Sequence, residues 1–66
     1  MFRIEKQAQG PDGGFVKLVH LNSDDFAVIV RHPGKGRLHQ RYIGPDLTKA
    51  EEVFGEEAKK IVAPQD

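Results

Sequence analysis

The residues best suited to chemistry in this chain are the cations of segment 31–41, whose sequence is Arg-His-Pro-Gly-Lys-Gly-Arg-Leu-His-Gln-Arg. The segment holds four permanently charged side chains and two histidines, and it contains no acid. Guanidinium groups bind phosphates and carboxylates through paired hydrogen bonds. The segment therefore predicts an anion-binding hairpin.

Side chains suited to catalysis are scarce. Ser23 and Thr48 are the candidate nucleophiles, but their positions are typical of a turn and of a helix N-cap. Asp24 and Asp25 form a carboxylate pair, but adjacent residues in a turn point apart and make poor acid and base partners. We therefore expect no catalytic residues and a protein that is not an enzyme.

Two short patterns in the basic segment partly resemble ligand sites. The nucleotide-binding loop GxxxxGK continues with Ser or Thr, whereas here Arg37 follows Gly34-Lys35-Gly36. His32 and His39 are expected to lie near each other across the hairpin, but two histidines without a third ligand do not form a zinc site. We expect no metal and no cofactor.

The chain has 66 residues, with ten basic and ten acidic side chains and no net charge. A neutral surface does not attract nucleic acid or membrane as a whole, so any electrostatic function is local. A chain of this length has one small core, and without cysteine it cannot be stabilised by disulfides. Oligomerisation remains as a way to bury more surface. The lack of cysteine, and of an apolar run near the roughly 18 residues that span a bilayer, predicts a cytoplasmic protein with no membrane partner.

Turn-forming residues divide the first two thirds of the chain into four short segments. Glycine, proline, asparagine and aspartate cluster at 10–14, 22–25, 33–36 and 44–46, where they favour tight turns. The intervening segments are rich in Phe, Val, Ile and Tyr, which favour strands. We expect strands over about 2–9, 15–21, 26–31 and 37–43.

The last segment has helical periodicity. Apolar side chains recur every three or four residues from Ala50 to Val62, which predicts one apolar helix face. Thr48 is the expected N-cap, because Thr48-Lys49-Ala50-Glu51 has the capping-box pattern, and Pro64 is expected to end the helix. The order predicts an α+β fold, a four-stranded antiparallel meander with one C-terminal helix packed on one face (ββββα). We expect a single domain over 1–63 and a frayed tail over 64–66.

Side chains alternate along strands, and this alternation predicts which residues share a face. With Arg31 placed opposite Arg37, the helix covers Phe26, Val28 and Val30 together with Leu38, Gln40 and Tyr42. The open face then holds Arg31, Arg37, His39 and Arg41. Two arginines directly opposite each other repel, which becomes useful if an anion lies near them. The alternative is that both guanidinium groups extend into water.

The same register predicts an apolar patch beside these cations. Val16, Leu18, Ile29 and Ile43 fall on the open face, and an exposed patch of this kind marks a partner interface. The first strand fits either orientation, and a one-residue shift of the first hairpin would instead let that strand cover part of the patch.

Residues 25–61 resemble the amino-terminal arm-type DNA-binding domain of phage tyrosine integrases. The resemblance rests on the strand DFAVIVR, the turn GKGR, the strand LHQRYIG and the helix start TKAEE. It implies a three-stranded sheet laid into the major groove with the helix behind it. It also implies DNA contacts from Lys35, Arg37, His39 and Arg41.

Two functional hypotheses follow. The first is a non-enzymatic nucleic-acid-binding module that binds duplex DNA through Arg31, Lys35, Arg37, His39 and Arg41, as an accessory or regulatory factor of a mobile element. The alternative is a small protein-interaction module, which binds another protein or forms a homodimer through the open, partly apolar sheet face.

Overall fold

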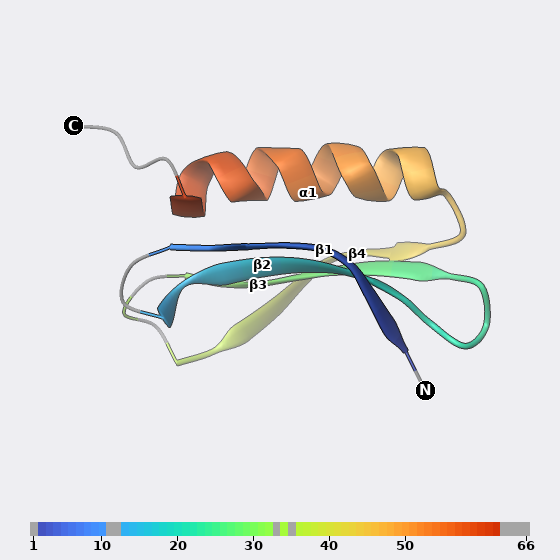
Figure 1. The fold of residues 1–66 in the computed structure, drawn as a ribbon, viewed down its shortest axis with the longest axis horizontal. Helices are drawn as coiled ribbons and strands as arrows, with labels where there is room; N and C mark the ends of the chain where they lie inside the picture. The colour runs from blue at the N-terminus through green and yellow to red at the C-terminus, as the bar shows by residue number, and fades with distance from the viewer. Residues whose placement is uncertain (1, 11–12, 33, 35, 63–66) are drawn as a thin grey trace.

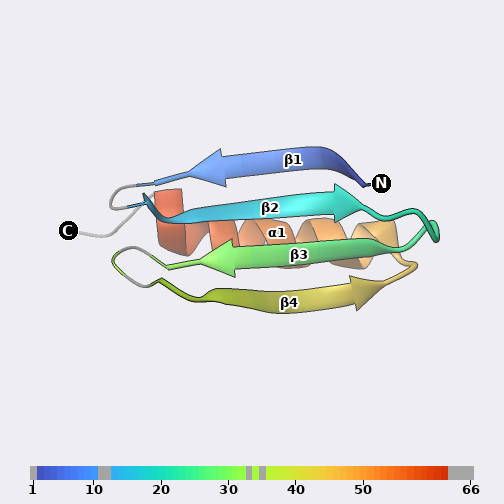
Figure 2. The same cartoon turned by 90° about the horizontal axis from the view of Figure 1, so that it is seen from below.

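The computed structural model describes residues 2–10, 13–32, 34 and 36–62. Four strands form one antiparallel sheet in the order β1-β2-β3-β4, namely β1 (Arg3–Gln9), β2 (Phe15–His20), β3 (Phe26–Arg31) and β4 (Leu38–Gly44). The helix α1 (Leu47–Val62) follows and lies along one face of the sheet, over the two central strands (Figures 1 and 2). The predicted ββββα fold is confirmed. Pro64 and the predicted tail 64–66 lie outside the described residues.

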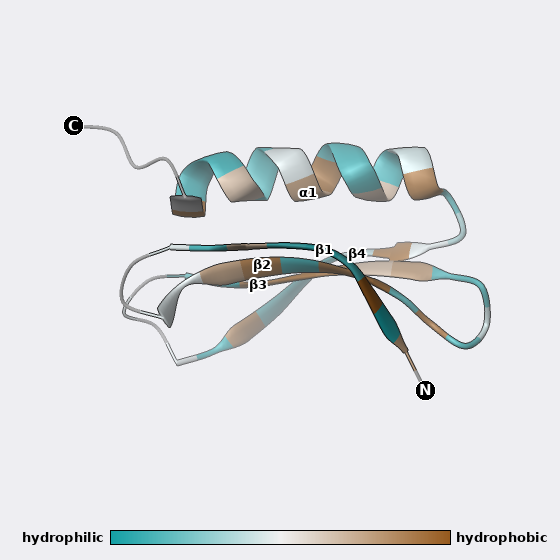
Figure 3. Cartoon of the chain, in the orientation of Figure 1, coloured by the Kyte–Doolittle hydropathy of each residue, from teal (hydrophilic) through white to brown (hydrophobic). Residues whose placement is uncertain are grey.

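The core lies between α1 and the sheet. Its fully buried side chains come from β2, β3 and α1, and they are Val16, Leu18, Val28, Val30, Ala50 and Ile61. Apolar positions recur along α1 among hydrophilic ones, as Figure 3 shows. No second layer among the described elements covers the other face of the sheet. No helix in the described part of the chain is long and apolar enough to cross a membrane.

The β2–β3 hairpin is shifted by one residue from the predicted pairing. A four-residue turn over 22–25 would pair Leu21 with Phe26, whereas the observed five-residue loop pairs His20 with Phe26. This loop is closed by the Leu21 N–H, which donates to the Asp25 carbonyl at 2.8 Å, and Asp24 adopts a positive φ of 65°. A one-residue shift turns every side chain of a strand to the other face, so the whole of β2 is reversed.

The edge strand β1 contains a β-bulge. Its pairing with β2 shifts between Ile4 and Lys6, which leaves Glu5 as the extra residue. Ala8 therefore packs against the core beneath α1, and the Lys6 Nζ lies 3.6 Å from Glu51 Oε2 on the helix. Ile4 falls on the opposite face, so the two orientations left open for this strand are both present, one on each side of the bulge.

The helix begins two residues earlier than predicted, and Asp46 is its N-cap. Asp46 Oδ1 accepts the Lys49 N–H at 3.1 Å, and the Asp46 carbonyl accepts the Ala50 N–H at 3.0 Å. The Tyr42 hydroxyl also accepts the Asp46 N–H at 3.2 Å, which ties the helix start to β4. The prediction of Thr48 as N-cap is wrong, because the helix already begins at Leu47 and Asp46 accepts a backbone donor of its first turn.

Gly10 joins the other end of the helix to the sheet. Its N–H donates to the Gly14 carbonyl at 2.9 Å, and its Cα lies against the last turn of α1. A Cβ at this position would clash with the backbone carbonyl of Ile61. The close approach of residue 10 to the helix therefore requires glycine.

The two candidate caps can be separated by substitution. Asp46→Ala should lower the free energy of unfolding by about 1 kcal/mol, because it removes the acceptor of the Lys49 N–H. Thr48→Ala should change it by less than about 0.5 kcal/mol. Urea denaturation followed by circular dichroism measures both, and a larger loss from Thr48→Ala would contradict the assignment of the cap.

Candidate functional site

The uncovered face of the sheet collects side chains from all four strands, and cross-strand pairing arranges them in three rows. The first row, called the apolar row below, is Ile4, Val19, Ala27 and Ile43. The second row is Gln7, Lys17, Ile29 and Gln40, and the third is Gln9, Phe15, Arg31 and Leu38. These three rows together are called the open face.

The apolar row is exposed at its two ends. Ile4 on β1 is 40% exposed and Ile43 on β4 is 52% exposed, whereas Val19 and Ala27 between them are buried by their neighbours. Leu38 in the third row is 56% exposed. Large apolar side chains gathered on one uncovered face are typical of a surface that binds a partner.

The charges of the open face are all positive. Lys17 and Arg31 are its charged members, and its three rows contain no acid. The Lys17 Nζ lies 4.8 Å from the centroid of the Phe15 ring, a cation–π contact that holds the lysine along the sheet. The open face is therefore apolar and basic.

The structure does not bring the predicted cations together on this face. Arg31 lies opposite Leu38 instead of Arg37, because the β3–β4 loop is one residue longer than expected. This shift places His39 opposite Val30, on the helix side of the sheet. Arg37 is exposed just before β4 begins, and Lys35 lies outside the described residues. The prediction of one cationic face is wrong.

A second β-bulge turns Arg41 toward the helix. The pairing of β4 with β3 shifts between Val28 and Ile29, which makes Arg41 the extra residue. The Arg41 Nε lies 3.7 Å from Glu57 Oε2 on α1. The bulge also restores the alternation, so Tyr42 packs under the helix as predicted. Arg41 is an ion-pair partner of the helix and not a member of the open face.

The predicted partner interface is half right. Ile29 and Ile43 lie on the open face as expected. Val16 and Leu18 do not, because the longer β2–β3 loop places them opposite Val30 and Val28, where they are fully buried beneath α1. Val19, which the sequence analysis did not place on this face, takes their place beside Ala27. The signal that would have placed these residues is the length of the β2–β3 loop, which has five residues instead of four.

Glu57 is a buried charged residue, and the sequence analysis did not identify it. The residue is 7% exposed, and its Oε1 has no hydrogen-bond partner among the described residues. Its Oε2 lies 3.7 Å from both Arg41 Nε and Lys60 Nζ. Two cations therefore compensate a carboxylate that faces the sheet at the helix edge next to β4.

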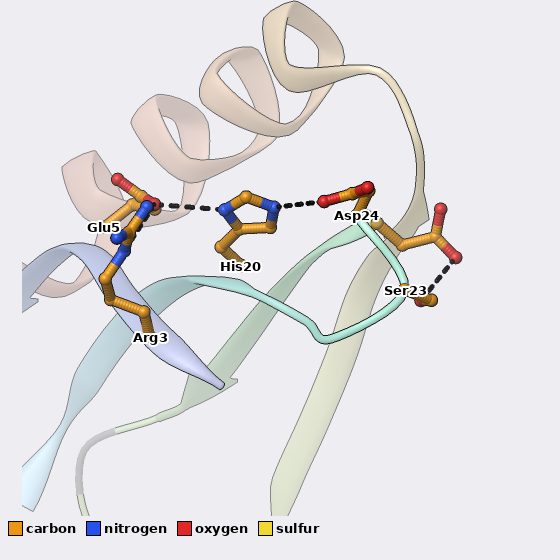
Figure 4. Close-up of polar contacts among 6 residues, drawn as sticks. Arg3, Glu5, His20, Ser23 and Asp24 are labelled. Atoms are coloured by element: carbon orange, nitrogen blue, oxygen red, sulfur yellow. Dashed lines mark hydrogen bonds and ion pairs between the residues drawn. The ribbon is translucent and has the colours of Figure 1, made fainter. Parts of the chain in front are cut away.

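A histidine between two carboxylates links β1 to the β2–β3 loop (Figure 4). His20 Nδ1 lies 3.4 Å from Glu5 Oε2, and its Nε2 lies 3.4 Å from Asp24 Oδ1. The imidazole stacks on Phe26 with ring centroids 4.6 Å apart. The nearby Ser23 hydroxyl donates to Asp25 Oδ2 at 3.2 Å, so it serves the turn. We interpret the cluster as a structural link.

His32 and His39 form no metal site with other described residues, and comparison with known proteins identifies no relative. The rings of His32 and His39 lie 5.8 Å apart, and no group of three or more potential ligands in the described ranges is arranged to hold a metal ion. No family model, no curated protein and no solved structure matches this chain. The resemblance to integrase arm domains stays a prediction.

The contact between Arg41 and Glu57 makes the placement of the second bulge testable. Arg41→Ala should lower the free energy of unfolding by about 0.5 to 1 kcal/mol, because a buried carboxylate loses one of its cations while Lys60 remains. Arg37→Ala, at an exposed position, is the matched control and should change it by less than about 0.5 kcal/mol. Equal effects in urea denaturation would contradict this placement of Arg41.

Proposed function

We propose that this chain is a non-enzymatic protein-interaction module that binds its partner through the open face of its sheet. The observation that carries the proposal is the apolar row, whose two end residues are exposed on the face that α1 leaves uncovered. Burying such side chains stabilises a complex in proportion to the apolar area removed from water.

The chemistry of the open face fits a protein surface. Protein interfaces combine an apolar centre with a polar rim in which arginine is common. Here Ile29, Val19 and Ala27 occupy the central strands, while glutamines on β1 and β4 and Arg31 at the end of β3 lie around them. A partner would therefore offer apolar side chains to the centre and hydrogen-bonding groups to the edge.

Duplex-DNA binding has less support from this arrangement. The DNA-binding hypothesis needs Arg31, Arg37, His39 and Arg41 on one face, but Arg41 pairs with Glu57 and His39 lies on the helix side. Among the described residues, Arg31 and Arg37 remain as candidates for DNA contacts. Two cations neutralise few phosphates and so contribute little to the affinity for DNA. A role as an accessory factor of a mobile element stays a prediction based on resemblance.

Site-specific photo-crosslinking tests the proposal. A photoreactive phenylalanine derivative is placed at Ile43 on the open face, at Arg37 beside the hairpin, or at Lys59 on the exposed side of α1, and each variant is irradiated in native cell extract. Position 43 should give adducts that a protease removes and a nuclease does not, and excess wild-type chain should compete with them. Position 59 should give none.

The competing outcomes are equally distinct. Nuclease-sensitive adducts from position 37, with no protein adduct from position 43, would support the nucleic-acid hypothesis and contradict the proposal. Equal protein adducts from positions 43 and 59 would mean that the open face has no special role.

A further inference from the structure

We infer that the occupant of the open face is a second copy of this chain, packed sheet against sheet about a twofold axis that runs parallel to the strands, midway between β2 and β3. The inference rests on the proposed function, because it takes the open face as the binding surface. It adds the identity of the partner and the geometry of the complex.

The shape of the sheet permits this packing. β-sheets are twisted, and in Figure 1 the N-terminal end of β1 and the start of β4 both bend away from α1. A twisted sheet has the form of a saddle. Rotation by 180° about an axis along its strands carries a saddle onto itself, so two copies meet with matched curvature. Closed twofold symmetry of this kind is the commonest arrangement of protein dimers.

The rows of the open face are complementary under this rotation. The axis keeps each row in place and exchanges β1 with β4 and β2 with β3. Ile4 therefore meets Ile43 of the second copy, and Val19 meets Ala27 of the second copy. The apolar row of one chain thus covers the apolar row of the other along its whole length.

The charges select this axis over the other twofold axis in the interface plane. With the axis parallel to the strands, Lys17 meets Ile29 of the second copy, and Arg31 meets Phe15 of the second copy, so no cation lies directly opposite another. An axis perpendicular to the strands would instead place Lys17 on Lys17 and pair Ile43 with Leu38. Two lysines that face each other repel, which disfavours that alternative.

The area of the open face sets the affinity expected for the dimer. Four strands about 4.8 Å apart and about 3.4 Å per residue give a face of roughly 400 Å² per copy. Two such faces bury roughly 800 Å² in total, which is below the range of about 1,200 to 2,000 Å² for stable interfaces and is typical of a weak, transient dimer. We expect a dissociation constant in the micromolar range. The helices, which carry acidic residues, lie on the outside of the dimer.

Cysteine crosslinking tests the geometry, since the natural chain has no cysteine. Packed sheets lie about 10 Å apart, which is beyond the reach of a disulfide, so a short bismaleimide is the probe. A mixture of purified Ile4→Cys and Ile43→Cys should crosslink at least tenfold more than either variant alone. In the inferred dimer two copies of position 4 are displaced sideways by about 14 Å, three strand spacings.

Other crosslinking outcomes would overturn the inference. Crosslinking between Ile43→Cys and Leu38→Cys in place of the 4–43 pair would indicate the perpendicular axis. Equal yields from every combination would indicate random collision. A chain that remains monomeric and uncrosslinked, yet gives a protein adduct of a different mass at position 43 in extract, would refute the second copy and leave the proposed function standing.

Sedimentation velocity provides a second readout. Ile29→Lys places a further cation opposite Lys17 of the second copy and should weaken dimerisation at least tenfold, whereas Lys59→Glu on the outside of α1 should leave it unchanged. Circular dichroism of both variants checks that the fold is retained. Equal dimerisation by the two folded variants would contradict the inference.

Discussion

The structure depends on the fact that one helix covers only one face of a four-stranded sheet. β2 and β3 carry apolar side chains on both faces, and α1 buries one set, which includes Val16, Leu18, Val28 and Val30. The other set, led by Val19, Ala27 and Ile29, has only its strand neighbours to cover it. Central strands that are apolar on both faces are typical of sheets covered on both sides. The proposed function follows from this imbalance.

Charged bulges protect the edges of the sheet. An edge strand offers unpaired backbone groups to other chains, and bulges and charges oppose such pairing. β1 bulges at Glu5, which contacts His20, and β4 bulges at Arg41, which contacts Glu57. Both edges are therefore irregular and charged, while the open face is regular and largely apolar. Association through the face is favoured over association through an edge.

The fold could be predicted from the sequence, but the composition of the faces could not. Turn residues and hydrophobic periodicity place all four strands and the helix correctly, because these signals are local. The register depends on loop length, and a single residue in the β2–β3 loop moved Val16 and Leu18 from the open face to the core. The bulge at Arg41 has no local signature, so the predicted cationic face divided between two sides of the sheet. The burial of Glu57 has no local signal in the sequence, because it depends on where α1 lies on the sheet.

The central claim is that the open face is covered by a second copy of the same face. Isotope-filtered nuclear Overhauser spectroscopy on a mixture of ¹³C-labelled and unlabelled chains tests it most directly. Ile4 and Ile43 lie at opposite edges of one sheet, about 14 Å apart by strand spacing, so a contact between their methyl groups can arise only between copies. The account predicts intermolecular contacts between these methyl groups and within the rest of the apolar row. An absence of intermolecular contacts at millimolar concentration, or contacts confined to the outer side of α1, would contradict it.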